Sequence, residues 1–237
     1  MIILIIYGLT PAVQPYNQKF KHINKDNLQS KKILIVAPHA DDEVLGIGGT
    51  VSKYKDTHQL GLIICGQRLV DNDNNVKQAT SHYDYVDILS QYKDEHYHEN
   101  FTDVVKCVED SVKSFRPDCV FIPNSNDFNK DHRTIHRVCE IVFRRYQEHA
   151  PDMILMYETP SSTTQSFHNN FKCNYYEVLD ESHVQSKIDT FLYYEKEVRQ
   201  YPNPRSAEGL LTYAKFRGME CNAEYAEGFQ ILYQKQL

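Results

Sequence analysis

One stretch of the chain reads Lys31-Lys32-Ile33-Leu34-Ile35-Val36-Ala37-Pro38-His39-Ala40-Asp41-Asp42-Glu43. Its run from Ile33 to Ala37 is aliphatic and rich in β-branched side chains, which is typical of a strand buried on both faces of a parallel sheet. The acids that follow would open a helix, so they and the histidine would lie at the carboxyl end of the strand. Open α/β sheets bind their ligands at this end. The stretch therefore predicts a fold class and the place of a site within it.

Three further apolar runs have the same character, from Leu60 to Cys65, from Asp118 to Ile122 and from Met153 to Met156. Helical patterns lie between these runs. The segment from Phe101 to Phe115 has apolar residues at roughly helical spacing and is followed by Arg116-Pro117, which would end the helix. This alternation of buried strands and amphipathic helices predicts an α/β fold with a mostly parallel sheet.

The rest of the chain is organised around these elements. The polar stretch from Gln67 to Gln78 is expected to form a loop over one end of the sheet. Apolar residues from Val184 to Val198 predict a further amphipathic helix that ends near Tyr201-Pro202. With 237 residues and no internal repeat, we expect one domain over residues 1–237, with residues 1–30 as an N-terminal extension packed on it.

Composition limits the classes of partner and the compartment. The net charge is -6, Trp is absent and the basic residues form no dense stripe, so nucleic acid is not expected as a partner. Six cysteines without a CxxC pair disfavour a structural zinc knuckle and favour free thiols in a reducing compartment. The apolar start from Ile2 to Tyr7 is too short to span a bilayer and lacks the parts of a signal peptide. We expect a soluble, cytoplasmic protein without a membrane span, and the sequence is compatible with a homo-oligomer.

Two strand ends bring together residues suited to a metal. The first offers His39 and the doublet Asp41-Asp42, and the second leads through a polar loop of residues 124–130 to Asp131-His132. Imidazole and carboxylate suit zinc, and three protein ligands with one water are the pattern of a catalytic site. The doublet allows one carboxylate to bind the metal while its neighbour takes a proton from the water.

This pattern resembles the LmbE/PIG-L family of deacetylases, through the stretch from His39 to Glu43 after a strand and the later Asp131-His132-Arg133. The motifs together span roughly Lys31 to Phe229. Further stretches that resemble the family are Tyr157-Glu158-Thr159, Pro204-Arg205-Ser206, and Arg217-Gly218 followed by Tyr225-Ala226-Glu227-Gly228-Phe229.

The resemblance implies a fold, a cofactor and a reaction. The fold would be a Rossmann-like three-layer sandwich. His39, Asp42 and His132 would bind Zn²⁺, with Asp41 as the general base, although iron accepts similar ligands. The substrate would be an N-acetylated amino sugar, free or linked to a nucleotide, a lipid or a glycan, from which the enzyme removes the acetyl group.

One position departs from the family pattern. Members commonly carry a His two residues before the Asp of the Asp-His pair, and this chain has Asn129 there. An Asn side chain can donate a hydrogen bond to a developing oxyanion but can neither carry a positive charge nor deliver a proton. Asn129 is therefore predicted to act electrostatically, while Asp41 serves as both base and acid.

Several other residues are candidates for supporting roles. Asp131 is expected to orient a histidine ligand. His136 could enter the site, or it could be a supporting or surface histidine. Arg68 could contact the substrate or be solvated in its loop, and Arg205 and Arg217 could build the rim of the site or form structural ion pairs.

Two other functions compete with the deacetylase. A non-haem iron oxygenase also uses two His and one carboxylate, but it would be expected on a jelly roll of short strands. A catalytically silent carbohydrate-binding protein could have kept the fold and the metal and lost turnover with the second His. The presence of Asp41 argues against this, because that carboxylate has no obvious use without a water to deprotonate.

Overall fold

The computed structural model describes residues 31–67, 73–85, 87–93, 97, 99–167 and 171–235. The expected N-terminal extension of residues 1–30 and Arg68 therefore lie outside the described residues. The strands are β1 Lys32–His39, β2 Gln59–Gln67, β3 Asp87–Lys93, β4 Cys119–Pro123, β5 Met153–Tyr157, β6 Tyr175–Leu179 and β7 Tyr225–Gln234. The helices are α1 Asp42–Tyr54, α2 Asp73–His82, α3 Phe101–Phe115, α4 Lys130–Val142, α5 Glu181–Leu192 and α6 Ala207–Glu220, with a short 3-10 helix η2 at Thr163–Gln165.

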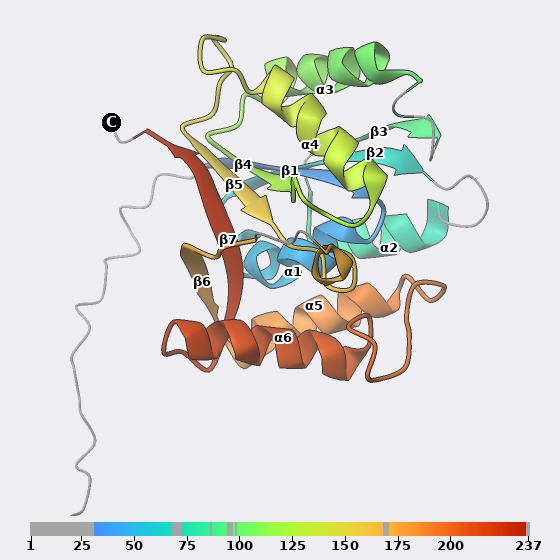
Figure 1. Ribbon diagram of the computed structural model, residues 1–237, viewed down its shortest axis with the longest axis vertical. Coiled ribbons are helices and arrows are strands. Elements are labelled where there is room, and N and C mark those ends of the chain that lie inside the picture. Colours follow the sequence, from blue (N-terminus) through green and yellow to red (C-terminus); the bar gives the residue numbers. More distant parts are fainter. Residues whose placement is uncertain are drawn as a thin grey trace, which may run out of the picture.

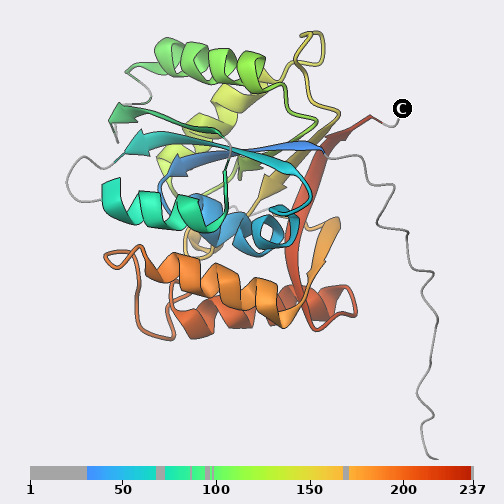
Figure 2. The same cartoon turned by 180° about the vertical axis from the view of Figure 1, so that it is seen from behind.

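The strands form one seven-stranded sheet in the order β3-β2-β1-β4-β5-β7-β6. The strands β1 to β5 run parallel, while β7 is antiparallel to both β5 and β6. Helices α3 and α4 cover one face of the sheet and α1 and α2 the other, with α5 and α6 packed beyond α1 (Figures 1 and 2). The predicted α/β sandwich with a mostly parallel sheet is confirmed, and the four predicted strand runs are β1, β2, β4 and β5.

The order of the strands in the sheet reverses at β1. The chain builds β1, β2 and β3 outward in one direction, then returns to place β4 on the free side of β1. After β1 the chain passes to the face of the sheet on which α1 lies, and after β4 it passes to the opposite face, on which α4 lies (Figure 1). Such a switch point opens a crevice at the carboxyl ends of the two strands, which is the usual ligand position in this type of sheet.

Strand β1 is apolar at successive positions because it is buried on both faces. Leu34 and Val36 pack into the cluster beneath α3 and α4, whereas Ile33, Ile35 and Ala37 pack into the cluster beneath α1, α5 and α6. All five side chains are at most 6% exposed. A strand between two helical layers has no solvent face, so the alternation of apolar and polar residues disappears.

The stretch from Gln67 to Gln78 is only partly a loop, and the expectation for it is wrong from Asp73 onward. Helix α2 begins at Asp73. Its inner side and the residue just beyond it contribute Ala79 and Tyr83 to the core, and both are fully buried. The polar residues at the start of the stretch give no helical pattern in the sequence. The helix is stabilised by tertiary packing of these two side chains, which the local sequence does not reveal.

The helix from Val184 is present but ends earlier than expected. Helix α5 stops at Leu192 rather than near Tyr201. Beyond this end the amide of Tyr194 donates to the carbonyl of Phe191, and the buried hydroxyl of Tyr194 donates to the Glu43 carboxylate. The helical pattern that continues to Val198 does not predict this contact with a distant residue.

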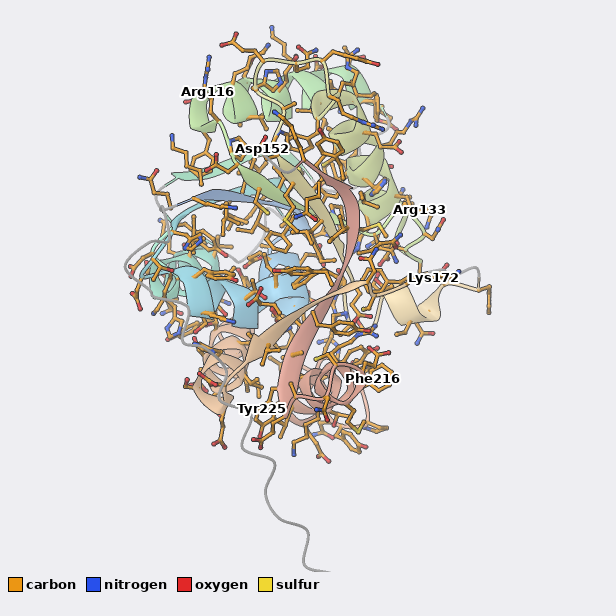
Figure 3. All side chains as sticks on the ribbon, turned by 90° about the vertical axis from the view of Figure 1, so that its left-hand side faces the viewer. Arg116, Arg133, Asp152, Lys172, Phe216 and Tyr225 are labelled. Atoms are coloured by element: carbon orange, nitrogen blue, oxygen red, sulfur yellow. The ribbon has the colours of Figure 1, made fainter. Side chains whose placement is uncertain are left out.

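The surface and the thiols agree with the composition of the chain. Exposed cations pair with acids, since Arg116 lies 3.1 Å from Glu148 and Lys235 lies 3.6 Å from Asp152. Arg116 and Asp152 are labelled in Figure 3. The six cysteines are free thiols. The helices of the described residues include none with the length and apolar character needed to cross a membrane.

Candidate metal centre

Only Ala40 and Asp41 separate the end of β1 from the start of α1. The chain makes this sharp turn because Asp41 adopts a left-handed backbone conformation with φ 117° and ψ -29°, which is uncommon for a residue with a side chain. The amide of Asp41 donates to Glu43 Oε2 at 2.9 Å, and its carbonyl accepts from the amide of Leu45 at 2.9 Å. Strained backbone clusters at functional sites, and here the turn places His39 beside the acidic doublet.

His39, Asp42 and His132 form a compact cluster. Asp42 Oδ2 lies 3.2 Å from His39 Nδ1 and 3.1 Å from His132 Nε2. The three side chains offer ligand atoms that all lie within 4.8 Å of one another. Asp42 and His132 are buried, while His39 is partly exposed. The fold thus brings together the three residues that are predicted as ligands. His39 ends β1, Asp42 begins α1, and His132 lies in the first turn of α4.

A further carboxylate lies behind each imidazole ring. Asp131 Oδ2 is 3.2 Å from His39 Nε2, and Asp127 Oδ1 is 3.4 Å from His132 Nδ1. Each ring therefore turns one nitrogen to Asp42 and the other to its own carboxylate. Such partners fix the tautomer of a histidine ligand and leave the other nitrogen to bind metal. The metal-facing atoms would be Nδ1 of His39 and Nε2 of His132.

Sequence reasoning misses Asp127, which lies in the loop before α4. Its carboxylate accepts hydrogen bonds from the hydroxyls of Ser162 and Thr163, the latter at 2.7 Å, and from the amide of Asn129 at 2.8 Å. Burial raises the pKa of Asp127, but the nearby His132 ring and hydrogen bonds from the two hydroxyls hold it below its usual value. The only sequence signal is one acid in a polar loop, because Ser162 and Thr163 come from a distant segment after β5.

The cluster is chemically suited to a cation. Asp42 Oδ1 and Asp131 Oδ1 are buried without a hydrogen-bond partner in the described part of the chain, which is unfavourable unless a cation or water meets them. Burial alone would lower the pKa of His39, but hydrogen bonds to Asp131 and Asp42 raise it to about 10. Burial would likewise lower the pKa of His132, but the charge of Asp42 and the contact with Asp127 raise it to about 9. The carboxylates thus favour positive charge here, which a dication would supply.

Asp41 lies next to this cluster. Its side chain is only 4% exposed, and its Oδ2 lies 3.1 Å from Arg205 Nη1. Burial and the charge of Asp42 raise the pKa of Asp41 well above its usual value, while the charge of Arg205 opposes the rise. A buried carboxylate with a raised pKa beside a metal site is suited to accept a proton.

Asn129 and His136 both have structural partners. Asn129 caps α4, since its Oδ1 accepts from the amide of Asp131 at 2.9 Å. Only its Nδ2 could then donate to a substrate. His136 Nδ1 lies 2.8 Å from the carbonyl oxygen of Pro123, and its Nε2 lies 3.9 Å from Glu140. The contact with Pro123 joins α4 to the end of β4, and it favours the supporting role for His136.

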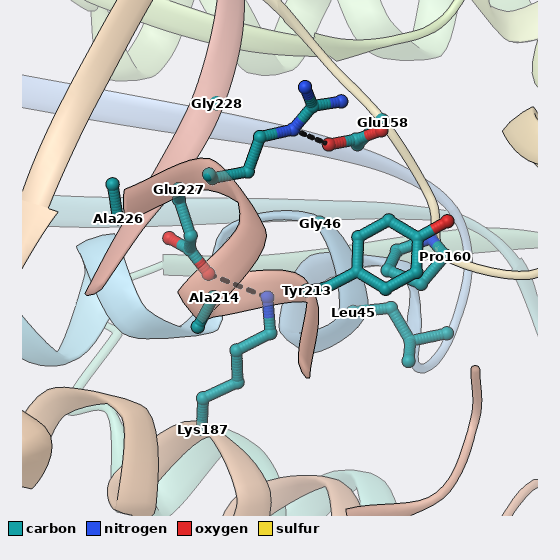
Figure 4. A pocket seen from close by; sticks show the side chains of 11 residues that line it. Leu45, Gly46, Glu158, Pro160, Lys187, Tyr213, Ala214, Ala226, Glu227 and Gly228 are labelled. Carbon is teal, nitrogen blue, oxygen red and sulfur yellow. Dashed lines mark hydrogen bonds and ion pairs between the residues drawn. The ribbon is translucent and has the colours of Figure 1, made fainter. Parts of the chain in front are cut away.

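The C-terminal motif residues line a small pocket beside α1, α6 and β7 (Figure 4). Arg217 Nε lies 2.6 Å from Glu158 Oε1, and Lys187 Nζ lies 2.6 Å from Glu227 Oε1. Glu227 also accepts two backbone amides in the middle of α1. Of the two alternatives for Arg217, the structure shows the ion pair, which joins α6 to the segment after β5.

Comparison with known proteins gives similarity in structure but not in sequence. No protein-family model and no curated protein matches the sequence. A conserved protein from Thermus thermophilus is 17% identical, with a TM-score of 0.71 over 87% of this chain and 97% of that chain. The N,N'-diacetylchitobiose deacetylase from Pyrococcus horikoshii is 20% identical, with a TM-score of 0.68 over 86% and 84%. A 4-carboxy-2-hydroxymuconate hydratase from Pseudomonas putida is 14% identical, with a TM-score of 0.65 over 88% and 98%.

These similarities establish the fold of the chain. At such low identities they do not carry a reaction from one protein to another, and the neighbours include both a deacetylase and a hydratase. Unrelated reactions commonly share a fold.

Proposed function

We propose that this protein is a zinc-dependent amide hydrolase that removes the acetyl group from an N-acetylated amino sugar or glycoconjugate. The observation that carries the proposal is the cluster of His39, Asp42 and His132 with the buried carboxylate of Asp41 beside it. The motifs that resemble the LmbE/PIG-L family supply these residues in the same order. The fold shared with the deacetylase from Pyrococcus horikoshii is consistent with the same chemistry.

Zinc suits the donor set, since imidazole nitrogens and carboxylate oxygens are among its usual ligands. Zinc held by His39, Asp42 and His132 would polarise the acetamide carbonyl and make a water molecule more acidic. Three protein ligands leave a position open, as catalytic sites require. Asp131 and Asp127 hold the two rings in the orientation that such binding needs.

Asp41 moves the proton in this proposal. A carboxylate oxygen of Asp41 takes a proton from the water that attacks the acetamide carbon, and it gives that proton to the nitrogen as the C–N bond breaks. The other proton of the water also ends on the amine, so the products are acetate and the protonated amino sugar, and Asp41 returns to its carboxylate form. Asn129 Nδ2 donates a hydrogen bond to the oxygen that gains negative charge, without transferring a proton.

The fold argues against an iron oxygenase but is compatible with a catalytically silent binding protein. An iron oxygenase is expected on a jelly roll, whereas the strands here are mostly parallel and interleaved with helices. A catalytically silent carbohydrate-binding protein is the second candidate, because Asn129 stands where the family commonly has a His. The two candidates differ in one measurable property, the release of acetate.

The test is acetate release from a panel of N-acetylated amino sugars by the protein as purified, after chelation and after reloading with zinc. The panel contains N-acetylglucosamine, its nucleotide-linked and lipid-linked forms, and N,N'-diacetylchitobiose. We expect release that chelation abolishes and zinc restores. The Asp41→Asn variant, purified in the same way, controls for a contaminating deacetylase. A protein that binds metal and sugar but releases no acetate from any sugar of the panel would overturn the proposal in favour of the silent binding protein.

A further inference from the structure

Arg205 contacts the proposed base directly. Its Nη1 lies 3.1 Å from Asp41 Oδ2 and 2.5 Å from Glu197 Oε2, and its Nε donates to Ser161 Oγ at 2.8 Å. Three separate segments meet at this one guanidinium, namely the turn before α1, the segment after α5 and the segment after β5. The geometry of a guanidinium is rigid and planar, so it can fix the relative positions of groups bound to it.

The backbone that carries Arg205 is itself held in place. The amide of Arg205 donates to Asn203 Oδ1 at 2.9 Å, and the next residue, Ser206, caps α6 by accepting from the amide of Gly209 at 2.9 Å. Gly209 allows α6 to begin close to this segment, because a Cβ there would lie 2.7 Å from the carbonyl oxygens of Asn203 and Pro204. A side chain on such a support is suited to orient another one.

Asp41 depends on Arg205 for its orientation. Asp41 stands at the N-cap of α1, where an aspartate ordinarily accepts a hydrogen bond from the first helix amides. Its side chain makes no such capping bond, and its Oδ2 contacts Arg205 instead. Without Arg205, no contact of this kind would keep the carboxylate away from the amides of the first turn of α1.

We propose that Arg205 is a positioning residue for the reaction, which holds the carboxylate of Asp41 out of the capping position of α1 and in place beside the metal cluster. The inference rests on the proposed function, because it assigns Arg205 a role that acts through the proposed base. Arg217 provides a matched control, since it is also a partly buried arginine but forms its ion pair with Glu158 at 2.6 Å.

The test compares Arg205→Gln, Arg205→Lys and Arg217→Gln by kcat and KM for acetate release, zinc content and thermal unfolding. Arg205→Gln is expected to lower kcat by about 100-fold and to change KM by about threefold or less, because a small displacement of a reacting group has effects of this size. Zinc content should stay at the wild-type level. Arg205→Lys keeps the charge and should recover part of kcat, and Arg217→Gln should leave kcat within about threefold.

A double variant shows whether Arg205 acts through Asp41. Adding Arg205→Gln to Asp41→Asn is expected to lower the residual kcat no further, because residues that act as a unit have non-additive effects. An equal loss in both backgrounds would overturn the inference. Should Arg205→Gln fail to fold, Arg205→Lys takes its place in the same comparison.

The outcomes separate this inference from the function on which it rests. A wild-type protein that releases acetate, together with an Arg205→Gln variant of unchanged kcat, would overturn the role of Arg205 alone. A wild-type protein that binds zinc but releases no acetate would overturn the proposed function, and the inference with it.

Discussion

Asp131 Oδ2 lies 3.2 Å from Nε2 of His39, on the nitrogen of the ring that does not face Asp42. The imidazole is therefore held between two carboxylates, one of which would share the metal with it. His132 has the same relation to Asp127 and Asp42. Each proposed histidine ligand thus has its own outer carboxylate, and both of these come from the segment that follows β4.

Replacing Asp131 by Asn should weaken zinc binding while leaving the three ligands in place. A neutral amide fixes the His39 ring less strongly and makes its metal-facing nitrogen less basic, so affinity should fall by roughly 10-fold to 100-fold. Competition with a chelating dye measures the affinity. Arg137→Gln, on the exposed side of α4, is the control, and wild-type affinity in Asp131→Asn would contradict the role given to Asp131.

The stabilisation by zinc should grow with pH. In the metal-free protein the pKa values of His39 and His132 are raised from 6.5 to about 10 and about 9. Stability from their protonated forms is complete below about pH 6.5 and is lost as the pH rises through those values. Zinc replaces these protons, so the difference in Tm between zinc-loaded and metal-free protein should widen from about pH 6 to about pH 9. A constant or narrowing difference in thermal unfolding would contradict this account.

Asn129 should have two separable roles, as a helix cap and as a hydrogen-bond donor. Ser can cap α4 but lacks the Nδ2 group, whereas Ala can do neither. Asn129→Ser should therefore keep its stability and lose roughly 100-fold in kcat, while Asn129→Ala should lose the same kcat and about 1 kcal/mol of stability. Denaturant unfolding and acetate release measure the two effects. Full turnover in both variants would remove Asn129 from the chemistry.

Gly46 should not tolerate a methyl group. A Cβ at this position would lie 2.3 Å from Tyr157 Cδ2, and Tyr157 is fully buried with its hydroxyl bonded to the carbonyl of Val36 at 2.9 Å. Alanine favours a helix over glycine by about 1 kcal/mol, but the overlap should make Gly46→Ala less stable by about 1 to 3 kcal/mol. Urea unfolding measures the change in the free energy of unfolding, with the exposed position Lys215→Ala as the control. A Gly46→Ala variant that is more stable than the wild type would show that α1 and β5 are packed less tightly than described.

The sequence predicts those parts of the protein that a local pattern determines. The continuous apolar run of β1 reflects burial on both faces, and the residues that end β1 and begin α4 lie at the carboxyl ends of neighbouring strands. The residue pattern therefore indicates that His39, the doublet Asp41-Asp42 and His132 lie at one end of the sheet, whereas the choice of Asp42 as the ligand comes from the resemblance to the LmbE/PIG-L family. Their convergence follows from the parallel sheet, in which the ends of adjacent strands meet at one edge.

Other parts of the site depend on contacts between distant segments. Asp127 is one acid in a polar loop until Ser162 and Thr163 bond to it. Arg205 could equally have formed the rim, and only the fold brings it within 3.1 Å of Asp41. The bond between Tyr194, just beyond the end of α5, and Glu43 likewise joins two segments that are distant in the sequence. Such contacts leave no periodic signal in the chain.

In the proposed mechanism His39, Asp42 and His132 hold the metal while Asp41 activates the water. Zinc content and acetate release, measured together on the variants Asp41→Asn and His39→Ala, separate these two roles. We expect Asp41→Asn to keep zinc at the wild-type level and to lose turnover by several orders of magnitude, whereas His39→Ala should lose both. Full acetate release by Asp41→Asn, or full zinc binding and turnover by His39→Ala, would contradict this mechanism.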